Sequence, residues 1–142
     1  MNKRAWLIPM LIVLINALII MVKWSSLEDS LPAHYDLEGN PNGVMSRSVL
    51  LLYPLIGFII CIIAYVIAMK KDRFQAGLVI LSSGLSLILL SSTLVTLTAG
   101  TMPIFMLAEP VILLIAVAGF IITLVKSRKK TSIPIRTDKV WE

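Results

Sequence analysis

Hydrophobic residues along the chain fall into four long runs, which polar or charged residues separate. The runs cover residues 5–22, 49–69, 74–98 and 102–125. Each run is close to the ~20 residues that an α-helix needs to cross a hydrocarbon core about 30 Å thick. The sequence therefore predicts an all-α, polytopic membrane protein. Its domain would be a four-transmembrane-helix bundle over residues 1–125, followed by a basic tail at 126–142.

The first run also has an interpretation as a secretory signal, because Lys3 and Arg4 precede it. Signal peptides have an apolar segment of about 7–15 residues and then a small-residue cleavage site. The run here is longer, and the following Lys23–Leu27 offers no clear site of that kind. We therefore expect the run to be retained as the first membrane helix.

Composition and charge favour the same class of protein. Apolar residues make up 58% of the sequence and the mean hydropathy is +0.92, whereas soluble chains are about 45–50% apolar. A net charge of +5 could indicate a nucleic-acid binder, but the basic residues gather at the ends of the apolar runs, where membrane topology explains them. Cys61 is the single cysteine, so no disulfide framework and no cysteine-based metal site are expected.

The distribution of basic residues predicts how the helices are oriented. Cytoplasmic flanks of membrane helices carry an excess of Lys and Arg. All thirteen such residues except Lys23 and Arg47 lie in the N-terminal segment, the connection before residue 74 and the tail, which would share one side. We therefore expect both termini in the cytoplasm, with anionic lipids at these basic flanks. Residues 23–48 would form an extracellular loop.

Small residues recur on one face of the second and third predicted helices. They are Gly57, Cys61, Ala64 and Ala68 in the second helix, and Gly77, Gly84, Ser91 and Thr98 in the third. Small side chains let the backbones of membrane helices approach closely. These faces predict packing within a tight bundle, and they would also suit a homo-oligomer or assembly with another membrane protein.

All four runs bring a polar side chain to a similar depth, about 6–11 Å below the outer boundary at 1.5 Å per residue. These residues are Asn16, Tyr53, Ser91, Ser92 and Glu109. Glu109 is the most informative, since a charged residue at the centre of a span costs about 2.5–3.5 kcal/mol and usually faces other helices. One interpretation is an outward-facing cavity that binds a ligand, proton or peptide. The other, which we favour, is a buried polar cluster that fixes helix register.

The loop between residues 23 and 48 is rich in residues that form turns. Gly39-Asn40 and Asn42-Gly43 accept positive φ angles, while Pro32 and Pro41 fix φ and stiffen the chain. We therefore expect an ordered loop that covers the outer ends of the helices.

His34 and Asp36 in this loop are candidates for metal ligation, but the pattern fits poorly. A calcium loop starting at Glu38 would have Val49 at its twelfth position, where Glu is required. His34 is the only histidine, so zinc would have carboxylate or amide partners alone. We expect hydrogen bonds of His34 and Asp36 that brace the loop, and no metal or other cofactor.

The same loop carries a recognisable motif, Leu-Pro-x-His-Tyr-Asp-x-x-Gly-x-Pro-x-Gly, which leads through Ser46-Arg47 into the next helix. It resembles the small bacterial membrane family called domain of unknown function sixteen forty-eight, which is also found in SdpI-type immunity proteins. Those proteins protect toxin producers from their own secreted peptide and can relay a signal. The resemblance therefore implies immunity or signalling at the bacterial plasma membrane. It is carried by Pro32, His34, Asp36, Gly39, Pro41 and Gly43.

The sequence contains none of the common catalytic motifs, such as Gly-x-Ser-x-Gly, His-Glu-x-x-His or a phosphate-binding loop, so enzymatic activity is not expected. The leading hypothesis is a membrane protein that recognises a secreted peptide or envelope stress at its extracellular face. The alternative is a structural or transport subunit that assembles through its small-residue helix faces. The tail is expected to anchor the last helix, and capture of a cytoplasmic regulator is a second option.

Overall fold

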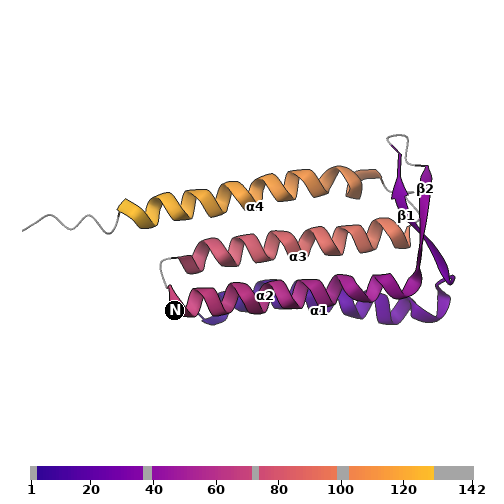
Figure 1. Ribbon diagram of the computed structural model, residues 1–142, viewed down its shortest axis with the longest axis horizontal. Coiled ribbons are helices and arrows are strands. Elements are labelled where there is room, and N and C mark those ends of the chain that lie inside the picture. The colour runs from indigo at the N-terminus through magenta and orange to yellow at the C-terminus, as the bar shows by residue number, and fades with distance from the viewer. Residues whose placement is uncertain (1–2, 37–39, 72–73, 99–102, 130–142) are drawn as a thin grey trace, which may run out of the picture.

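The computed structural model describes residues 3–36, 40–71, 74–98 and 103–129 of the chain. Its four α-helices are α1 (Leu7–Lys23), α2 (Leu52–Lys70), α3 (Gln75–Leu97) and α4 (Pro103–Lys129). Between α1 and α2 lie strands β1 (Ser30–Tyr35) and β2 (Pro41–Ser46), and short 3-10 helices occupy Lys3–Trp6 (η1), Trp24–Ser26 (η2) and Arg47–Leu51 (η3). The helices run side by side along the long axis, and the two strands project at one end (Figure 1).

Within the described residues, four helical segments are long and apolar enough to cross a membrane. They are Arg4–Ser26, Arg47–Lys70, Gln75–Leu97 and Ala108–Ser127. The prediction of an all-α membrane bundle with four spans is therefore confirmed. We call the end with the strands the hairpin end. The opposite end, where α1 begins and α4 ends (Figure 1), is called the basic end after Arg4, Lys70, Lys71 and Lys126, which the chain places there.

The small-residue face predicted for the second helix is confirmed as a packing face. The buried residues of α2 are Gly57, Cys61, Ala64 and Ala68. At Gly57, an added Cβ would lie 2.9 Å from the Cγ2 atom of Val13 on α1, so only glycine allows this approach without a shift. The large apolar residues on the other faces of α2 are exposed, as expected for side chains that contact lipid.

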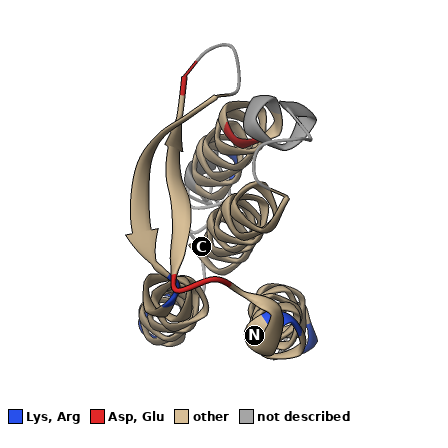
Figure 2. Cartoon of the chain, turned by 90° about the vertical axis from the view of Figure 1, so that its right-hand side faces the viewer, with Lys and Arg blue, Asp and Glu red and all other residues tan. Residues whose placement is uncertain are grey.

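Helix α3 is the centre of the bundle, and α4 lies at its periphery. α3 packs against each of the other three helices, while the principal contact of α4 is with α3. The buried share is 44% for the α3 span and only 6% for the α4 span. Figure 2 shows α3 between α4 and the α1–α2 pair. The bundle is therefore asymmetric, and α4 approaches α3 closely where Gly84 lies against the Cβ of Ala116.

The ordered loop between α1 and α2 is a two-stranded antiparallel hairpin. Its paired residues include Leu31 with Met45 and Pro32 with Val44. The prediction of a turn at Asn42-Gly43 is wrong, because both residues lie within β2. Gly43 pairs with His34, and an added Cβ there would lie 2.9 Å from the His34 ring. Close approach of the imidazole, rather than a turn, thus explains this glycine.

Candidate functional site at the hairpin end

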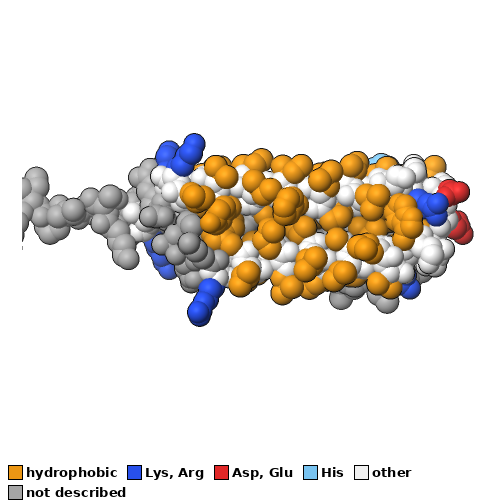
Figure 3. Space-filling view, turned by 90° about the horizontal axis from the view of Figure 1, so that it is seen from below, with side chains coloured by type: hydrophobic (Ala, Val, Ile, Leu, Met, Phe, Trp, Pro, Cys, Tyr) orange, Lys and Arg blue, Asp and Glu red, His pale blue; other side chains and the backbone are white. Residues whose placement is uncertain are grey.

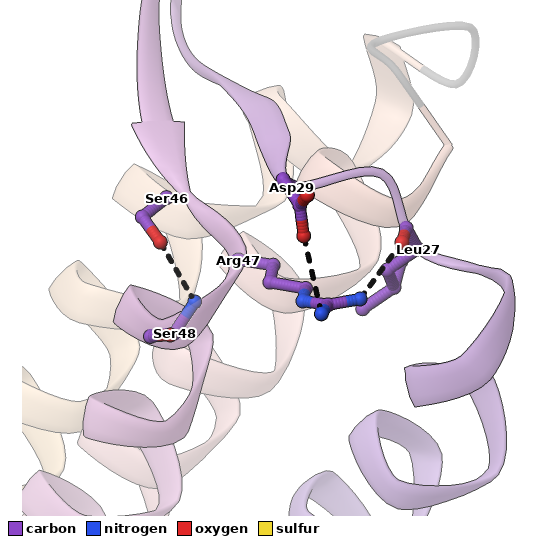
Figure 4. Close-up of polar contacts among 5 residues, drawn as sticks. All are labelled: Leu27, Asp29, Ser46, Arg47 and Ser48. Atoms are coloured by element: carbon purple, nitrogen blue, oxygen red, sulfur yellow. Dashed lines mark hydrogen bonds and ion pairs between the residues drawn. The ribbon is translucent and has the colours of Figure 1, made fainter.

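Arg47, the first residue after β2, joins the base of the hairpin to the end of α1. Its Nη2 lies 3.1 Å from Asp29 Oδ1, and its Nη1 donates a hydrogen bond to the Leu27 carbonyl at 3.3 Å (Figure 4). The backbone N–H of Arg47 donates to the Asp29 carbonyl at 3.0 Å. The guanidinium also lies over the Trp24 ring, 5.2 Å from its centroid. One planar, multi-donor side chain therefore connects η2, the segment before β1 and η3.

The helix that follows starts with a side-chain hydrogen bond of its own. Ser46 has extended backbone angles at the N-cap of η3, and its Oγ accepts from the backbone N–H of Ser48 at 3.4 Å (Figure 4). Serine is favoured at such positions because its oxygen satisfies an N–H that has no partner within the helix. A hydrogen bond between neighbouring residues, Ser46 and Ser48, therefore marks the change from strand to helix.

Asp36 and Asn40 close the far end of the hairpin. The backbone N–H of Asn40 donates to Asp36 Oδ1 at 2.8 Å, the Asn40 amide to Asp36 Oδ2 at 3.3 Å, and the Asp36 N–H to the Asn40 carbonyl at 2.9 Å. Asp36 therefore braces the loop through hydrogen bonds. His34 contributes through the packing of its ring on Gly43. Gly39 lies outside the described residues.

The face of the hairpin that points toward the helices joins the apolar core at this end. Leu31 of β1 is buried with Ile20 of α1 and Leu50 of η3, and Trp24, Leu27, Met45, Tyr53 and Leu97 pack around them. The Tyr35 hydroxyl donates to the Val95 carbonyl of α3 at 3.4 Å. Burial raises the pKa of the Tyr35 phenol above its usual value. The hairpin is thus packed onto α1, α2 and α3.

The opposite face of the hairpin forms an open hollow of about 660 Å³. Paired residues of an antiparallel hairpin share a face, and alternate pairs point to opposite faces. Pro32 and Val44 accordingly lie on this face, while the adjacent pair of Leu31 and Met45 packs toward the core. The lining residues are Glu28, Ser30, Leu31, Pro32, Pro41, Asn42, Gly43 and Val44. Val44 is 77% exposed, so the paired strands present an apolar patch beside a carboxylate.

The predicted polar layer is divided between different helix pairs. Ser92 of α3 donates to Glu109 Oε1 of α4 at 2.8 Å, and Tyr53 of α2 lies within electrostatic range of Glu109. Asn16 of α1 is 1% exposed, and its Oδ1 atom has no hydrogen-bond partner among the described residues. Ser91 is buried. Because α3 separates α1 from α4, residues at one depth do not all meet (Figure 2).

Pro110 lies inside α4 beside Glu109. A proline within a helix removes one backbone hydrogen bond and leaves a carbonyl of the preceding turn without its donor. Pro110 therefore interrupts the backbone hydrogen bonding of α4 next to Glu109, the residue that accepts the hydrogen bond from Ser92.

No group of three or more His, Cys, Asp and Glu residues suited to a metal ion occurs in the described parts of the chain. His34 and Asp36 lie on the hairpin but do not belong to such a group. The residues that connect the hairpin to the helices, Arg47 and Trp24, were absent from the candidate set. The sequence signal for Arg47 was its isolation as a basic residue after the four acidic residues of the loop, at the end with the fewest cations.

The hairpin and its supporting helices coincide with a known family. Residues 11–58 match the family model described as Domain of unknown function (DUF1648). The match covers most of α1, both strands, η3 and the start of α2, while α3 and α4 lie beyond it. No curated protein and no solved structure matches the chain. The segment that builds the hairpin and attaches it to α1 and α2, residues 11–58, is thus similar to the family Domain of unknown function (DUF1648).

Proposed function

We propose that this multi-pass membrane protein is a non-enzymatic immunity or signalling protein of the SdpI type. In this proposal its hairpin end faces the outside of the bacterial plasma membrane and recognises a secreted peptide or another envelope stress. The observation that carries the proposal is the hollow on the solvent face of the hairpin, which is open and adjoins the packed interior at Leu31.

The chemistry of the hollow favours a cationic peptide with apolar side chains. Glu28 contributes a carboxylate, and Pro32 and Val44 contribute an apolar surface whose shape the paired strands fix. Rigid binding surfaces lose little conformational entropy when a ligand docks. Asp29, which is 90% exposed, follows Glu28 in the chain, but its charge is paired with Arg47, so Glu28 supplies the negative charge of the hollow. A peptide with a basic residue next to an aliphatic one would complement this face.

The proposed orientation rests on charge. Arg4, Lys70, Lys71 and Lys126 are exposed at the basic end, which the positive-inside rule assigns to the cytoplasm. The hairpin then lies where a secreted peptide arrives, and anionic lipids of the inner leaflet contact the basic end.

The experiment is a peptide-sensitivity assay in a strain that lacks the gene. Cells are challenged with candidate cationic membrane-active peptides, with and without the wild-type protein. If the proposal is correct, loss of the gene raises sensitivity to at least one peptide and the wild-type protein restores resistance. Unchanged sensitivity to every peptide would remove the case for immunity.

A pair of variants then tests the hollow itself. Glu28→Gln removes the carboxylate, and we expect it to lose a large part of the protection. Ser25→Lys makes the same change in net charge at an exposed position that does not line the hollow, so it should protect like the wild type. Equal protection by both variants would place recognition elsewhere.

The alternative, a structural or transport subunit, needs a face for assembly. The small-residue faces that suggested it are occupied within one chain, since Gly57 lies against Val13 and Gly84 against Ala116. Native mass spectrometry in mild detergent distinguishes the two functions. A stable heteromer would favour the alternative, and a monomer would favour the stand-alone sensor.

A further inference from the structure

A continuous apolar groove separates α1 from α2 on the membrane-facing side of the bundle. These two helices contact each other less than either contacts α3. Two adjoining hollows, of about 620 Å³ and 270 Å³, share Leu7, Met10 and Phe58 in their walls. The larger one extends to Ala17 and Pro54, and the smaller one reaches Trp6 and Tyr65 near the basic end. Figure 3 shows this face, with apolar side chains along its length, basic side chains at both ends and acidic side chains at the hairpin end only.

The groove is elongated, open and apolar, as binding of a hydrocarbon chain requires. From Leu7 to Ala17 it follows about 15 Å of α1 at 1.5 Å per residue. A single acyl chain is much thinner than a helix, and the lining is almost entirely apolar.

The end of the groove supplies groups that would recognise the polar part of a lipid. Trp6 lines the smaller hollow, packs edge-to-face on Tyr65 at 5.4 Å, and is 6% exposed. Its Nε1 atom is buried without a hydrogen-bond partner among the residues that the structure describes. A buried indole N–H usually has an acceptor, and an ester carbonyl of a phospholipid is one. Lys70, exposed at the end of α2, provides positive charge near the same boundary.

We propose that this groove binds one phospholipid with an anionic headgroup from the leaflet at the basic end. Its acyl chain lies between α1 and α2, its ester carbonyl accepts from Trp6 Nε1 after the indole turns toward the hollow, and its phosphate lies near Lys70. The lipid would complete the packing of the two helices that support the hairpin. This site lies outside the hollow of the proposed function and does not depend on it.

Fluorescence quenching of Trp6 tests the proposal on the full-length chain. Trp24→Phe and Trp141→Phe leave Trp6 as the only tryptophan, and the protein is reconstituted in phosphatidylcholine vesicles. A small fraction of the lipid is replaced by brominated phosphatidylglycerol or, in parallel, by brominated phosphatidylcholine. Since a basic residue near the surface contributes about 1 kcal/mol toward anionic lipid, we expect about a fivefold preference for the glycerol lipid.

Matched variants locate the site. Lys70→Gln should remove most of that preference, whereas Lys126→Gln, the same change at the end of α4, should leave it. Ala17→Phe fills the groove and should reduce quenching by both lipids, whereas Ala118→Phe, at an exposed position of α4, should not. Equal quenching by the two lipids would overturn the proposal. So would quenching that a folded Ala17→Phe protein leaves unchanged. The lipid comparison needs no groove variant, so it decides the matter even if Ala17→Phe does not fold.

Discussion

Arg47 holds Asp29 through both its side chain and its backbone. Its Nη2 lies 3.1 Å from the Asp29 carboxylate, and its N–H donates to the Asp29 carbonyl at 3.0 Å. The two residues stand just outside the two ends of the hairpin, one before β1 and one after β2. Their contacts therefore close the hairpin at its base, where α1 and α2 meet it.

Replacing Arg47 with Lys should loosen the base of the hairpin without changing the net charge. Lysine lacks the planar fork that contacts Asp29 and Leu27 together. We expect amides of β1 and β2 to exchange hydrogen about three- to tenfold faster, as for the loss of one or two hydrogen bonds. Hydrogen exchange of the protein in nanodiscs measures this. Arg4→Lys, the same substitution at the basic end, is the control, and equal exchange in both variants would contradict the role of Arg47.

Replacing Gly84 with Ala should weaken the attachment of α4 to α3. The added Cβ would collide with the Cβ of Ala116, so the two backbones must separate. Overpacking of this kind typically costs about 1–3 kcal/mol of folding free energy. Unfolding in mixed micelles with increasing dodecyl sulfate measures the change. Ala118→Val adds volume at an exposed position of α4 and should have little effect; a similar loss in both variants would argue against a specific contact at Gly84.

The hydrogen bond between Ser92 and Glu109 should appear as a coupling energy. In a double-mutant cycle of Ser92→Ala and Glu109→Ala, we expect about 0.6 kcal/mol and at most about 1.7 kcal/mol, the range found for polar pairs between membrane helices. Ser83→Ala with Glu109→Ala is the control cycle, because the Ser83 hydroxyl is buried without a hydrogen-bond partner in the described structure and should give additive effects. Additivity in the Ser92 cycle would show that the bond does not stabilise the fold.

Glu109→Gln separates a structural role of this residue from proton coupling. Glutamine keeps an oxygen that accepts from Ser92 but does not titrate. If Glu109 only fixes helix register, the variant should retain protection against the responsive peptide over the whole pH range tested. Loss of protection confined to one part of that range would support proton coupling instead.

The docking of Tyr35 on α3 should weaken at alkaline pH. Burial raises the pKa of this phenol above 10.0, and the neutral hydroxyl donates to Val95. Between pH 10.0 and the higher pKa of the folded state, Tyr35 is therefore mostly protonated in the folded protein and mostly deprotonated in the unfolded chain. The contribution of Tyr35 to stability is complete below pH 10.0 and decreases as the pH rises through the folded-state pKa. The difference in tyrosinate absorbance between wild type and Tyr35→Phe should have its midpoint above 10.0; a lower midpoint would contradict burial of the phenol.

Some contacts could be predicted from the sequence because they depend only on the spacing of residues along one helix or on their depth in the membrane. The face of Gly57, Cys61, Ala64 and Ala68 follows from helical periodicity alone, and it is the buried face of α2. The depth estimate likewise placed Ser92 and Glu109 at one level, where they bond. Depth does not specify rotation about the helix axis or the choice of neighbour. Asn16 therefore shares that level on α1 without a partner for its Oδ1 among the described residues.

The sequence by itself determined that the chain crosses a membrane four times, because span length and hydropathy are local properties matched to the thickness of the bilayer. Only the tertiary structure decided that α3 is central and α4 peripheral. Lipid tails are as apolar as Leu, so hydropathy does not distinguish a helix face in lipid from one against another helix. The hairpin, its closure by Arg47 and the packing of Gly43 on His34 likewise depend on residues that meet only after folding.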